Sequence, residues 1–334
     1  MKTGPMTRKR VSIKDVATMA GVSTSTVSHV INDTRYVADE TKQRILRVIE
    51  ELNYRPSFLA QGLKRQTSQT IGLILSDLRG SFFYRFVDTL GSILQEDDYD
   101  VLVCNSASSV AKERRHIEML LRKGIDGLVY APVDYRTYNE ELIRWNVPFV
   151  QVERKNASYQ ADYVGIDDQH EAARVTEFMI SRGCRRVAFL MHGETIFSGR
   201  RLLGYQSATQ EHGCYDADLI ERLGLDREQS IEALVQWLTA REPVDGVICT
   251  NLRLCRWLLQ ALQQLGADYP RPRVFSFDDD PWLALLAQPV SALAQPIEEI
   301  AARTVETLLG RMRGDDSPAK DLRLQCALID RFPD

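Results

Sequence analysis

The hydrophobic pattern of the chain changes its period near residue 70. Between positions 11 and 54, apolar residues recur every three or four positions, which is the spacing of one face of a helix. From Thr70 onward, short continuous apolar runs alternate with longer segments of helical periodicity. That alternation is typical of buried parallel strands joined by helices. The sequence therefore predicts a small all-α head followed by a larger α/β body.

Three helices are expected in the head. Ser12, with Asp15 three residues later, forms an acidic variant of a capping box, and Ser23 is placed to cap the second helix. Between them, Gly21 permits the positive φ of a tight turn. A third helix is expected from Thr41 to Asn53. The apolar faces of the three helices are Ile13, Val16, Ala17 and Ala20, then Val27, Val30 and Ile31, then Ile45, Val48, Ile49 and Leu52.

The second helix has a polar side suited to the DNA major groove. This side consists of short or flat hydrogen-bonding groups: Thr24, Ser25, Ser28, His29 and Asn32. Such groups reach base edges and phosphates when a recognition helix lies in the groove. An ordinary capped helical hairpin would have the same spacing, so this pattern alone leaves both interpretations open.

A short segment with turn residues separates the head from the body. Pro56 breaks the chain, and residues 57–64 make too short a helix to be stable alone, although contact with a partner could order them. Residues 66–69 form a polar linker into the body.

The body is predicted to contain two Rossmann-like lobes. Similar sequences at 125–129 and 244–248 occupy matching points of two successive α/β units. In open parallel sheets, ligands bind at the carboxyl ends of the strands, so a site is expected in a cleft between the lobes. The expected strands are 71–75, 101–104, 127–131, 149–152, 164–166, 187–191, 246–249 and 274–277, and the expected helices are 82–94, 114–121, 171–181, 200–212, 229–240 and 251–265.

Composition narrows the class of protein. At 334 residues, with 44% hydrophobic and 26% charged residues, the chain is expected to be globular with two or three compact units. No run approaches the roughly 18 apolar residues of a membrane span, and no apolar run follows the basic N-terminus as in a secretory signal. The six scattered cysteines include no CxxC pair, so we expect reduced thiols, a cytoplasmic location, no metal and no cofactor.

Charge is divided unevenly along the chain. Residues 1–66 contain twelve Lys and Arg against six Asp and Glu, a net charge of +6, and the remainder carries −10. A basic head on an acidic body is what DNA binding by one end requires.

The chain resembles the LacI/GalR family of bacterial transcription repressors over nearly its whole length. The motifs that carry the resemblance are IKDVATMAGVSTSTVSHVIN (13–32), ELNYRPSFLAQGLK (51–64), TIGLILSDLRGSFF (70–83), KGIDGLV (123–129), RRLLGY (200–205), and FDD (277–279) before AQP (294–296). The resemblance implies a homodimer with a helix-turn-helix head (1–54), a hinge helix and linker (55–68) and a periplasmic-binding-protein-like effector and dimerisation domain (69–334). Within that domain, the N-terminal lobe is expected at about 69–166 plus 296–325, and the C-terminal lobe at about 167–295 plus 326–334.

The resemblance also implies roles for individual residues at the DNA. Thr24, Ser25 and His29 match the base-reading positions, and Thr26, Ser28 and Asn32 match phosphate-contacting positions. Leu63 matches the hinge leucine that wedges into the minor groove, and Lys64 follows it. The set is similar to that of purine and ribose repressors, which implies a pseudo-palindromic operator with a central CpG.

In the effector cleft the match is less complete. Phe82 and Phe83 match an aromatic pair beside the ligand, although Gly80-Ser81 replaces the Asn-Pro of many members. The other expected effector-binding residues are Arg201, Asp278 and, at the lobe crossover, Asp167. Each could instead be structural, because phenylalanines at a helix start are usually core residues and an Arg or Asp is usually part of a surface pair.

One departure from the family pattern suggests the chemistry of the effector. Many relatives have N-D-x-x-A-x-G where this chain has Asn251-Leu252-Arg253-Leu254-Cys255-Arg256-Trp257, so a carboxylate is lost and two arginines are gained. Arg forks match carboxylate and phosphate, so we expect a sugar acid or sugar phosphate as the effector. The alternative places Arg253 on the solvent face of its helix.

Other functions are weighed against this interpretation. No nucleophile elbow, Walker loop, dinucleotide fingerprint or metal spacing indicates an enzyme, and the DNA-type head argues against a transport-type binding protein. We expect a repressor of a carbohydrate-metabolism operon. A corepressor-dependent regulator that binds a nucleobase-like or neutral sugar ligand is the alternative, because effector binding could release or strengthen DNA binding. The absence of a heptad-patterned helix after residue 324 favours a dimer over a coiled-coil tetramer.

Overall fold

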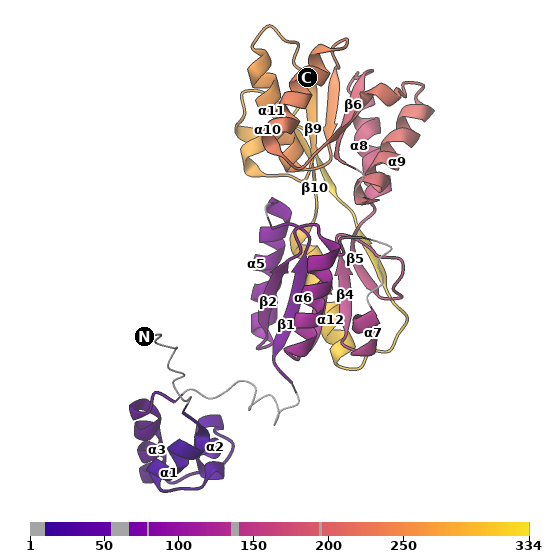
Figure 1. Ribbon diagram of the computed structural model, residues 1–334. Coiled ribbons are helices and arrows are strands. Elements are labelled where there is room, and N and C mark those ends of the chain that lie inside the picture. The colour runs from indigo at the N-terminus through magenta and orange to yellow at the C-terminus, as the bar shows by residue number, and fades with distance from the viewer. Residues whose placement is uncertain (1–10, 55–66, 79, 135–139, 194–195, 334) are drawn as a thin grey trace, which may run out of the picture. The chain divides into compact units, whose positions relative to one another are not determined.

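The computed structural model describes residues 11–54, 67–78, 80–134, 140–193 and 196–333. Internal contacts divide the chain into two units, Met1–Ser68 and Gln69–Asp334. The described residues of the first unit form three helices, and those of the second form two parallel-stranded lobes (Figure 1).

The head is a compact three-helix unit: α1 (Ile13–Ala20), α2 (Thr24–Asn32) and α3 (Asp39–Glu51). The capping box at the start of α1 is confirmed, with both reciprocal bonds between Ser12 and Asp15 present. Gly21 has a φ of 65°, and the Ser23 hydroxyl accepts a hydrogen bond from the Thr26 amide at 3.1 Å. The buried core of the head is Val16, Ala17, Ala20, Val27, Val30, Ile45 and Val48.

The N-terminal lobe is a parallel sheet of order β11-β5-β4-β3-β1-β2. The strands are β1 (Thr70–Leu75), β2 (Asp100–Asn105), β3 (Gly127–Tyr130), β4 (Phe149–Val152), β5 (Asp162–Ile166) and β11 (Asp321–Leu324). Its helices are α5 (Ser81–Glu96), α6 (Val110–Arg122), α7 (Glu140–Arg144) and α12 (Ile297–Met312). Helix α12 comes from the end of the chain but packs on α5 and on β3, β4 and β5.

The C-terminal lobe repeats this arrangement, with sheet order β12-β10-β9-β8-β6-β7. Only β12, which runs antiparallel to β10, departs from parallel pairing among the described strands of this sheet. The strands are β6 (Val187–His192), β7 (Ile220–Leu223), β8 (Gly246–Cys249), β9 (Arg273–Phe277), β10 (Ser291–Ala294) and β12 (Ala327–Ile329). The helices are α8 (Asp168–Ser181), α9 (Ile196–Glu211), α10 (Arg227–Thr239) and α11 (Leu252–Leu265), with short 3₁₀ turns η1 (Ala217–Leu219) and η2 (Pro281–Leu285).

Three crossover segments join the lobes, from β5 to α8, from β10 to α12 and from β11 to β12. Strands β1, β3 and β4 hold the same places in the first sheet as β6, β8 and β9 hold in the second. The predicted fold class, a helical head followed by two parallel α/β lobes, is confirmed.

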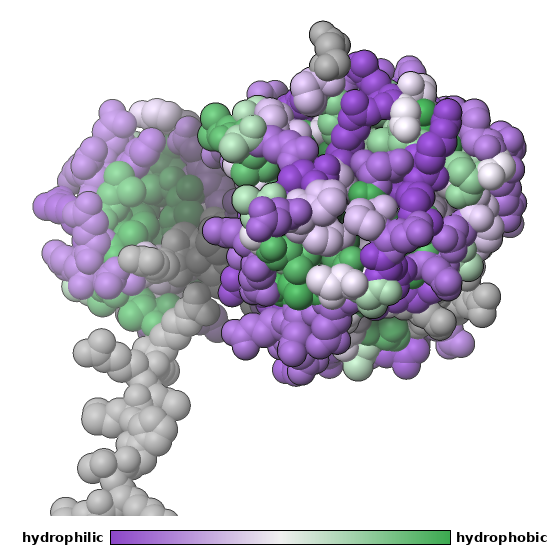
Figure 2. Space-filling model, turned by 90° about the horizontal axis from the view of Figure 1, so that it is seen from above, coloured by the Kyte–Doolittle hydropathy of each residue, from purple (hydrophilic) through white to green (hydrophobic). Residues whose placement is uncertain are grey.

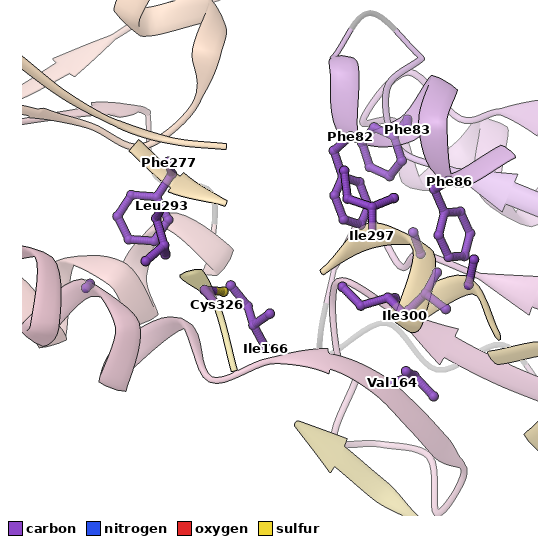
Figure 3. Packing of buried hydrophobic residues seen from close by; sticks show 14 of the residues in the cluster. Phe82, Phe83, Phe86, Val164, Ile166, Phe277, Leu293, Ile297, Ile300 and Cys326 are labelled. Atoms are coloured by element: carbon purple, nitrogen blue, oxygen red, sulfur yellow. The ribbon is translucent and has the colours of Figure 1, made fainter. Parts of the chain in front are cut away.

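Buried apolar side chains line both sides of the crossover region (Figure 3). Phe82, Phe83 and Ile297 gather on the N-terminal lobe, while Phe277 and Leu293 lie on the C-terminal lobe. The end of the body formed by the C-terminal lobe carries mainly hydrophilic side chains with scattered apolar ones (Figure 2). Among the described residues, no helix combines the length and apolar character needed to cross a membrane.

Candidate effector cleft and DNA-binding helix

Helix α2 presents the polar side that the sequence predicts. Thr24 and Ser25 in its first turn are exposed, and Thr26, Ser28, His29 and Asn32 are half-buried. The Asn32 amide donates to the Ser28 carbonyl at 2.8 Å, and His29 Nδ1 lies 2.9 Å from the Thr34 hydroxyl. The buried residues Val27 and Val30 hold one side of α2 in the core of the head, while short polar groups occupy the other side. Leu63 and Lys64 lie outside the described residues.

A cavity of about 550 Å³ opens between the two lobes of the body. Its walls come from the carboxyl ends of the parallel strands, as expected for open α/β sheets. Asp77 follows β1 and Glu153 follows β4 in one lobe, and Thr250 follows β8 and Asp278 follows β9 in the other. Further lining residues are Phe82, Phe83, Arg154, Asp168, His192, Arg201, Arg227, Arg253, Arg256, Trp257, Trp282 and Gln295.

Arg201 is fixed in the wall of this cavity by three kinds of contact. Its Nε donates to an Asp168 carboxylate oxygen at 2.7 Å, and another guanidinium nitrogen donates to the Thr250 carbonyl at 2.6 Å. The guanidinium also lies over the Phe277 ring at 4.3 Å. A cation held in this way is preorganised, so little conformational entropy is lost when it meets a ligand.

Two carboxylates approach the cavity from opposite lobes. Glu153 and Asp278 each follow the equivalent strand of their lobe, and both have left-handed backbone conformations, with φ of 59° and 69°. Burial raises the pKa of both carboxyls, against the opposing effect of nearby arginines, Arg154 for Glu153 and Arg201 for Asp278. Asp278 also accepts a hydrogen bond of 2.6 Å from the Gln295 amide.

Three further arginines line the wall. Arg253, the second residue of α11, donates to the carboxylate of Asp77. Arg256 lies over the Trp282 ring at 5.5 Å, and Arg227 begins α10. The sequence also allowed Arg253 to lie on the solvent face of its helix. That alternative is wrong, because the Arg253 side chain is only 25% exposed and lines the cavity.

The aromatic pair at the start of α5 is both core and cavity wall. Phe82 and Phe83 are 4% and 6% exposed, and their rings meet edge to face at 5.2 Å. Phe82 also stacks on Phe86 at 5.9 Å. The two expectations for this pair, ligand contact and ordinary core, are therefore compatible.

Asp167 is placed differently from the other expected effector residues. Its carboxylate caps α8 through the His170 amide and accepts a hydrogen bond of 2.6 Å from Arg323. Among the described residues that line the cavity, its neighbour Asp168 is present and Asp167 is not. Asp167 therefore lies at the crossover, where it caps α8. Asp168 is the first residue of that helix, and its side chain lines the cavity.

Several lining residues were missed from the sequence although a signal was present. Asp77, Glu153 and Thr250 come within two residues of the end of a buried strand that the sequence predicts. Applying the strand-end rule to every strand would have found them. Asp168 carries the same signal, because it lies two residues beyond the end of the predicted strand 164–166, whereas Trp282 carries none, since a 3₁₀ turn positions it. Within the described ranges, no three His, Cys, Asp or Glu side chains form a group that could hold a metal ion.

Comparisons with known proteins identify the family. Residues 12–57 match the model of bacterial regulatory proteins of the lacI family, and residues 176–332 match a periplasmic binding protein-like domain. The chain is 30% identical to the HTH-type transcriptional repressor PurR of Vibrio atlanticus over 96% of this chain and 97% of that protein. The chain belongs to the lacI family of bacterial regulatory proteins.

Other family members show the same full-length correspondence. The HTH-type transcriptional regulator PtxS of Pseudomonas plecoglossicida is 32% identical over 99% of this chain and 97% of its own length. The crystal structure of the lac repressor dimer bound to operator and the anti-inducer ONPF has a TM-score of 0.79 at 21% identity, covering 97% of this chain and 98% of that one. The present chain is a DNA-binding transcriptional regulator, a class of protein without enzymatic activity.

Proposed function

We propose that the protein represses a carbohydrate-metabolism operon and that a sugar acid or sugar phosphate, bound between the lobes, controls its DNA binding. The observation that carries this proposal is the polarity of the cavity. Its wall holds Arg227, Arg253 and Arg256, and it also holds the carboxylates of Glu153 and Asp278.

These two kinds of group suit the two ends of such a ligand. Guanidinium groups bind carboxylate or phosphate through charge-assisted, often paired hydrogen bonds. Carboxylates accept hydrogen bonds from sugar hydroxyls, and the buried hydroxyl oxygen of Thr250 has no hydrogen-bond partner among the described residues. A polyhydroxy chain with one anionic end would satisfy all three kinds of group.

At the DNA, the proposed roles follow the family positions. Thr24, Ser25 and His29 would read base edges, and Thr26, Ser28 and Asn32 would contact phosphates. Leu63 would wedge into the minor groove beside Lys64. The exposure of Thr24 and Ser25 on α2 supports this assignment.

The proposed organisation is a cytoplasmic homodimer with a head (1–54), a hinge helix and linker (55–68) and an effector and dimerisation domain (69–334). The N-terminal lobe would comprise about 69–166 plus 296–325, and the C-terminal lobe about 167–295 plus 326–334. The contact boundary at Ser68 and the memberships of β11 and β12 in different sheets support these limits. The effector would act by changing lobe closure, which orders the hinge.

Titration calorimetry on the full chain tests the effector class. We expect D-gluconate or D-glucose 6-phosphate to bind, and D-glucose to bind at least tenfold more weakly, because it forms no charge-assisted bonds to the arginines. Arg253→Ala should weaken binding of the anion by about tenfold or more, the equivalent of one charged hydrogen bond. Binding of D-glucose alone, with Arg253→Ala unchanged, would contradict the proposal.

A second candidate ligand is favoured by the aromatic part of the wall. Phe82, Trp257 and Trp282 could hold a planar nucleobase-like corepressor. The same calorimetry with adenine and guanine tests this alternative. Binding of a purine base without binding of either anion would replace the sugar-acid proposal by the corepressor one.

A further inference from the structure

An ion pair joins the two lobes across the cavity. Asp77, two residues beyond the end of β1, belongs to the N-terminal lobe, and Arg253, at the start of α11, belongs to the C-terminal lobe. The Arg253 guanidinium donates to the Asp77 carboxylate, and the two side chains are 25% and 17% exposed. Both line the cavity.

The pair lies several strands away from β5 and β10, where two of the connecting segments leave their sheets. In its sheet β1 is three strands from β5, and in the other sheet β8, which precedes Arg253, is two strands from β10. At about 4.8 Å per strand, these separations are on the order of 14 Å and 10 Å. A bond at that distance from the crossovers resists opening of the lobes more effectively than a bond beside them.

Arg253 differs from the other cavity arginines in already holding a carboxylate that belongs to the opposite lobe. Arg256 lies over an indole ring and Arg227 donates to the Gln260 amide oxygen at 3.4 Å. His192 adds no positive charge beside Arg253, since burial and then the charge of Arg253 lower the pKa of its ring. Asp77 therefore occupies a place on Arg253 that the anionic group of an effector requires.

We propose that Asp77 is a built-in competitor for the anionic group of the effector, which displaces the Asp77 carboxylate from Arg253 and thereby breaks the ion pair between the lobes. This inference rests on the proposed anionic effector. It makes Asp77 a specificity-determining residue of the cavity.

The exchange discriminates between ligands by charge. When an anion replaces Asp77, the Arg253 charge stays paired in a partly buried site, and the cost of leaving it unpaired is avoided. A neutral sugar offers no such replacement, so it leaves the ion pair intact. The internal competitor lowers the apparent affinity of anions in proportion to the fraction of molecules in which Arg253 is occupied.

Calorimetry with D-gluconate, D-glucose 6-phosphate and D-glucose tests the competition. In Asp77→Asn, which is nearly isosteric, we expect the anion that binds the wild-type chain to bind on the order of threefold to tenfold more tightly. Asp77→Ala should shift the affinity in the same direction, and the gain should be larger for the anion than for D-glucose. The control Asp97→Asn removes one negative charge from a pair with Arg313, outside the cavity lining, and should change neither affinity.

The outcomes separate this inference from the proposed function. If an anion binds the wild-type chain but Asp77→Asn and Asp77→Ala bind it equally or more weakly, the competition is overturned and the effector class stands. If neither anion binds the wild-type chain or either variant, both are overturned. Tighter binding of only one of the two anions supports the competition and identifies whether carboxylate or phosphate replaces Asp77.

Discussion

The guanidinium group of Arg311, in the last turn of α12, links this helix to two other segments of the N-terminal lobe. It forms paired hydrogen bonds of 2.7 and 2.9 Å with the Asp162 carboxylate at the start of β5. It also donates to the carbonyls of Asp315, Ser317 and Pro318 in the loop that leads to β11. The last turn of α12, the return loop and β5 are thus held together where one crossover strand begins.

Asp162→Asn is expected to lower the free energy of unfolding by about 2 kcal/mol, because the change removes two charge-assisted hydrogen bonds and leaves a half-buried guanidinium with Asp315 as its remaining charged partner. Burial raises the pKa of Asp162, but the hydrogen bonds from Arg311 and Lys320 outweigh burial, so the pKa lies below its ordinary value. Since the folded-state pKa is the lower one, this stabilisation is fully present above pH of about 4 and is lost as the pH falls through the folded-state pKa.

Urea denaturation of the variant and the wild-type chain at pH 7 and at decreasing pH measures both effects. Asp97→Asn, at an exposed pair with Arg313 of 3.3 Å, is the control and should cost less than about 1 kcal/mol. An equal loss in the two variants would contradict the role given to Asp162.

The roles of single residues could be predicted where their partners are near neighbours in the chain. Ser12, Asp15 and Ser23 cap helices because their partners are three residues away. The contact of Arg253 with Asp77 could not be predicted, since 176 positions separate these residues and only the tertiary fold brings them together.

At the scale of elements, Gly204 explains how α9 reaches α8. A Cβ at this position would overlap the carbonyl oxygen of Gln169 and lie 2.8 Å from the Ala173 amide nitrogen. The close approach lets Arg201 reach Asp168 from the next helix, and places the buried Tyr205 hydroxyl 2.7 Å from the Val187 carbonyl. The R-x-x-G-[FY] pattern in RRLLGY is therefore a helix-packing device that also positions a cavity arginine.

Gly204→Ala should destabilise the protein by about 1 to 3 kcal/mol, because the added methyl group must push the two helices apart. Gly199→Ala on the same helix is the matched control, since its Cβ would meet nothing within 4 Å. It should be neutral or stabilising by up to about 1 kcal/mol, as expected for alanine in a helix. The urea midpoints of the two variants give the comparison, and a similar shift in both would refute the packing argument.

Most central strands and the edge strand β2 were predicted, whereas β7, β10, β11 and β12 were not. The expected strands 149–152 and 246–249 have the bounds of β4 and β8, because each is a buried apolar run between clear turns. Strands β7 and β11 contain charged residues, so neither forms a continuous apolar run, and β12 has only three residues. Helix α12 was missed although Ile297, Ile300 and Ala301 begin a regular apolar face, so that signal was available.

At the scale of the whole molecule, two separate units carry the two halves of the function. The contact boundary falls at Ser68, close to where the net charge changes from +6 for residues 1–66 to −10 for the remainder. In the proposed division of roles, basic charge on the head supplies sequence-independent attraction to phosphates, and the polar side of α2 supplies discrimination between sequences. The fold, the family and the DNA-binding role could be read from the sequence, but the effector could not, because its cavity is assembled from both lobes.

The most direct test of the account is selection of DNA sites from a random double-stranded library by the full-length protein, followed by sequencing. We expect enrichment of an inverted repeat with a central CpG, because two copies of α2 would read two half-sites of one operator. The enriched site should lose or gain affinity when D-gluconate or D-glucose 6-phosphate is added. Recovery of no common sequence, or of single half-sites without inverted symmetry, would contradict the central claim.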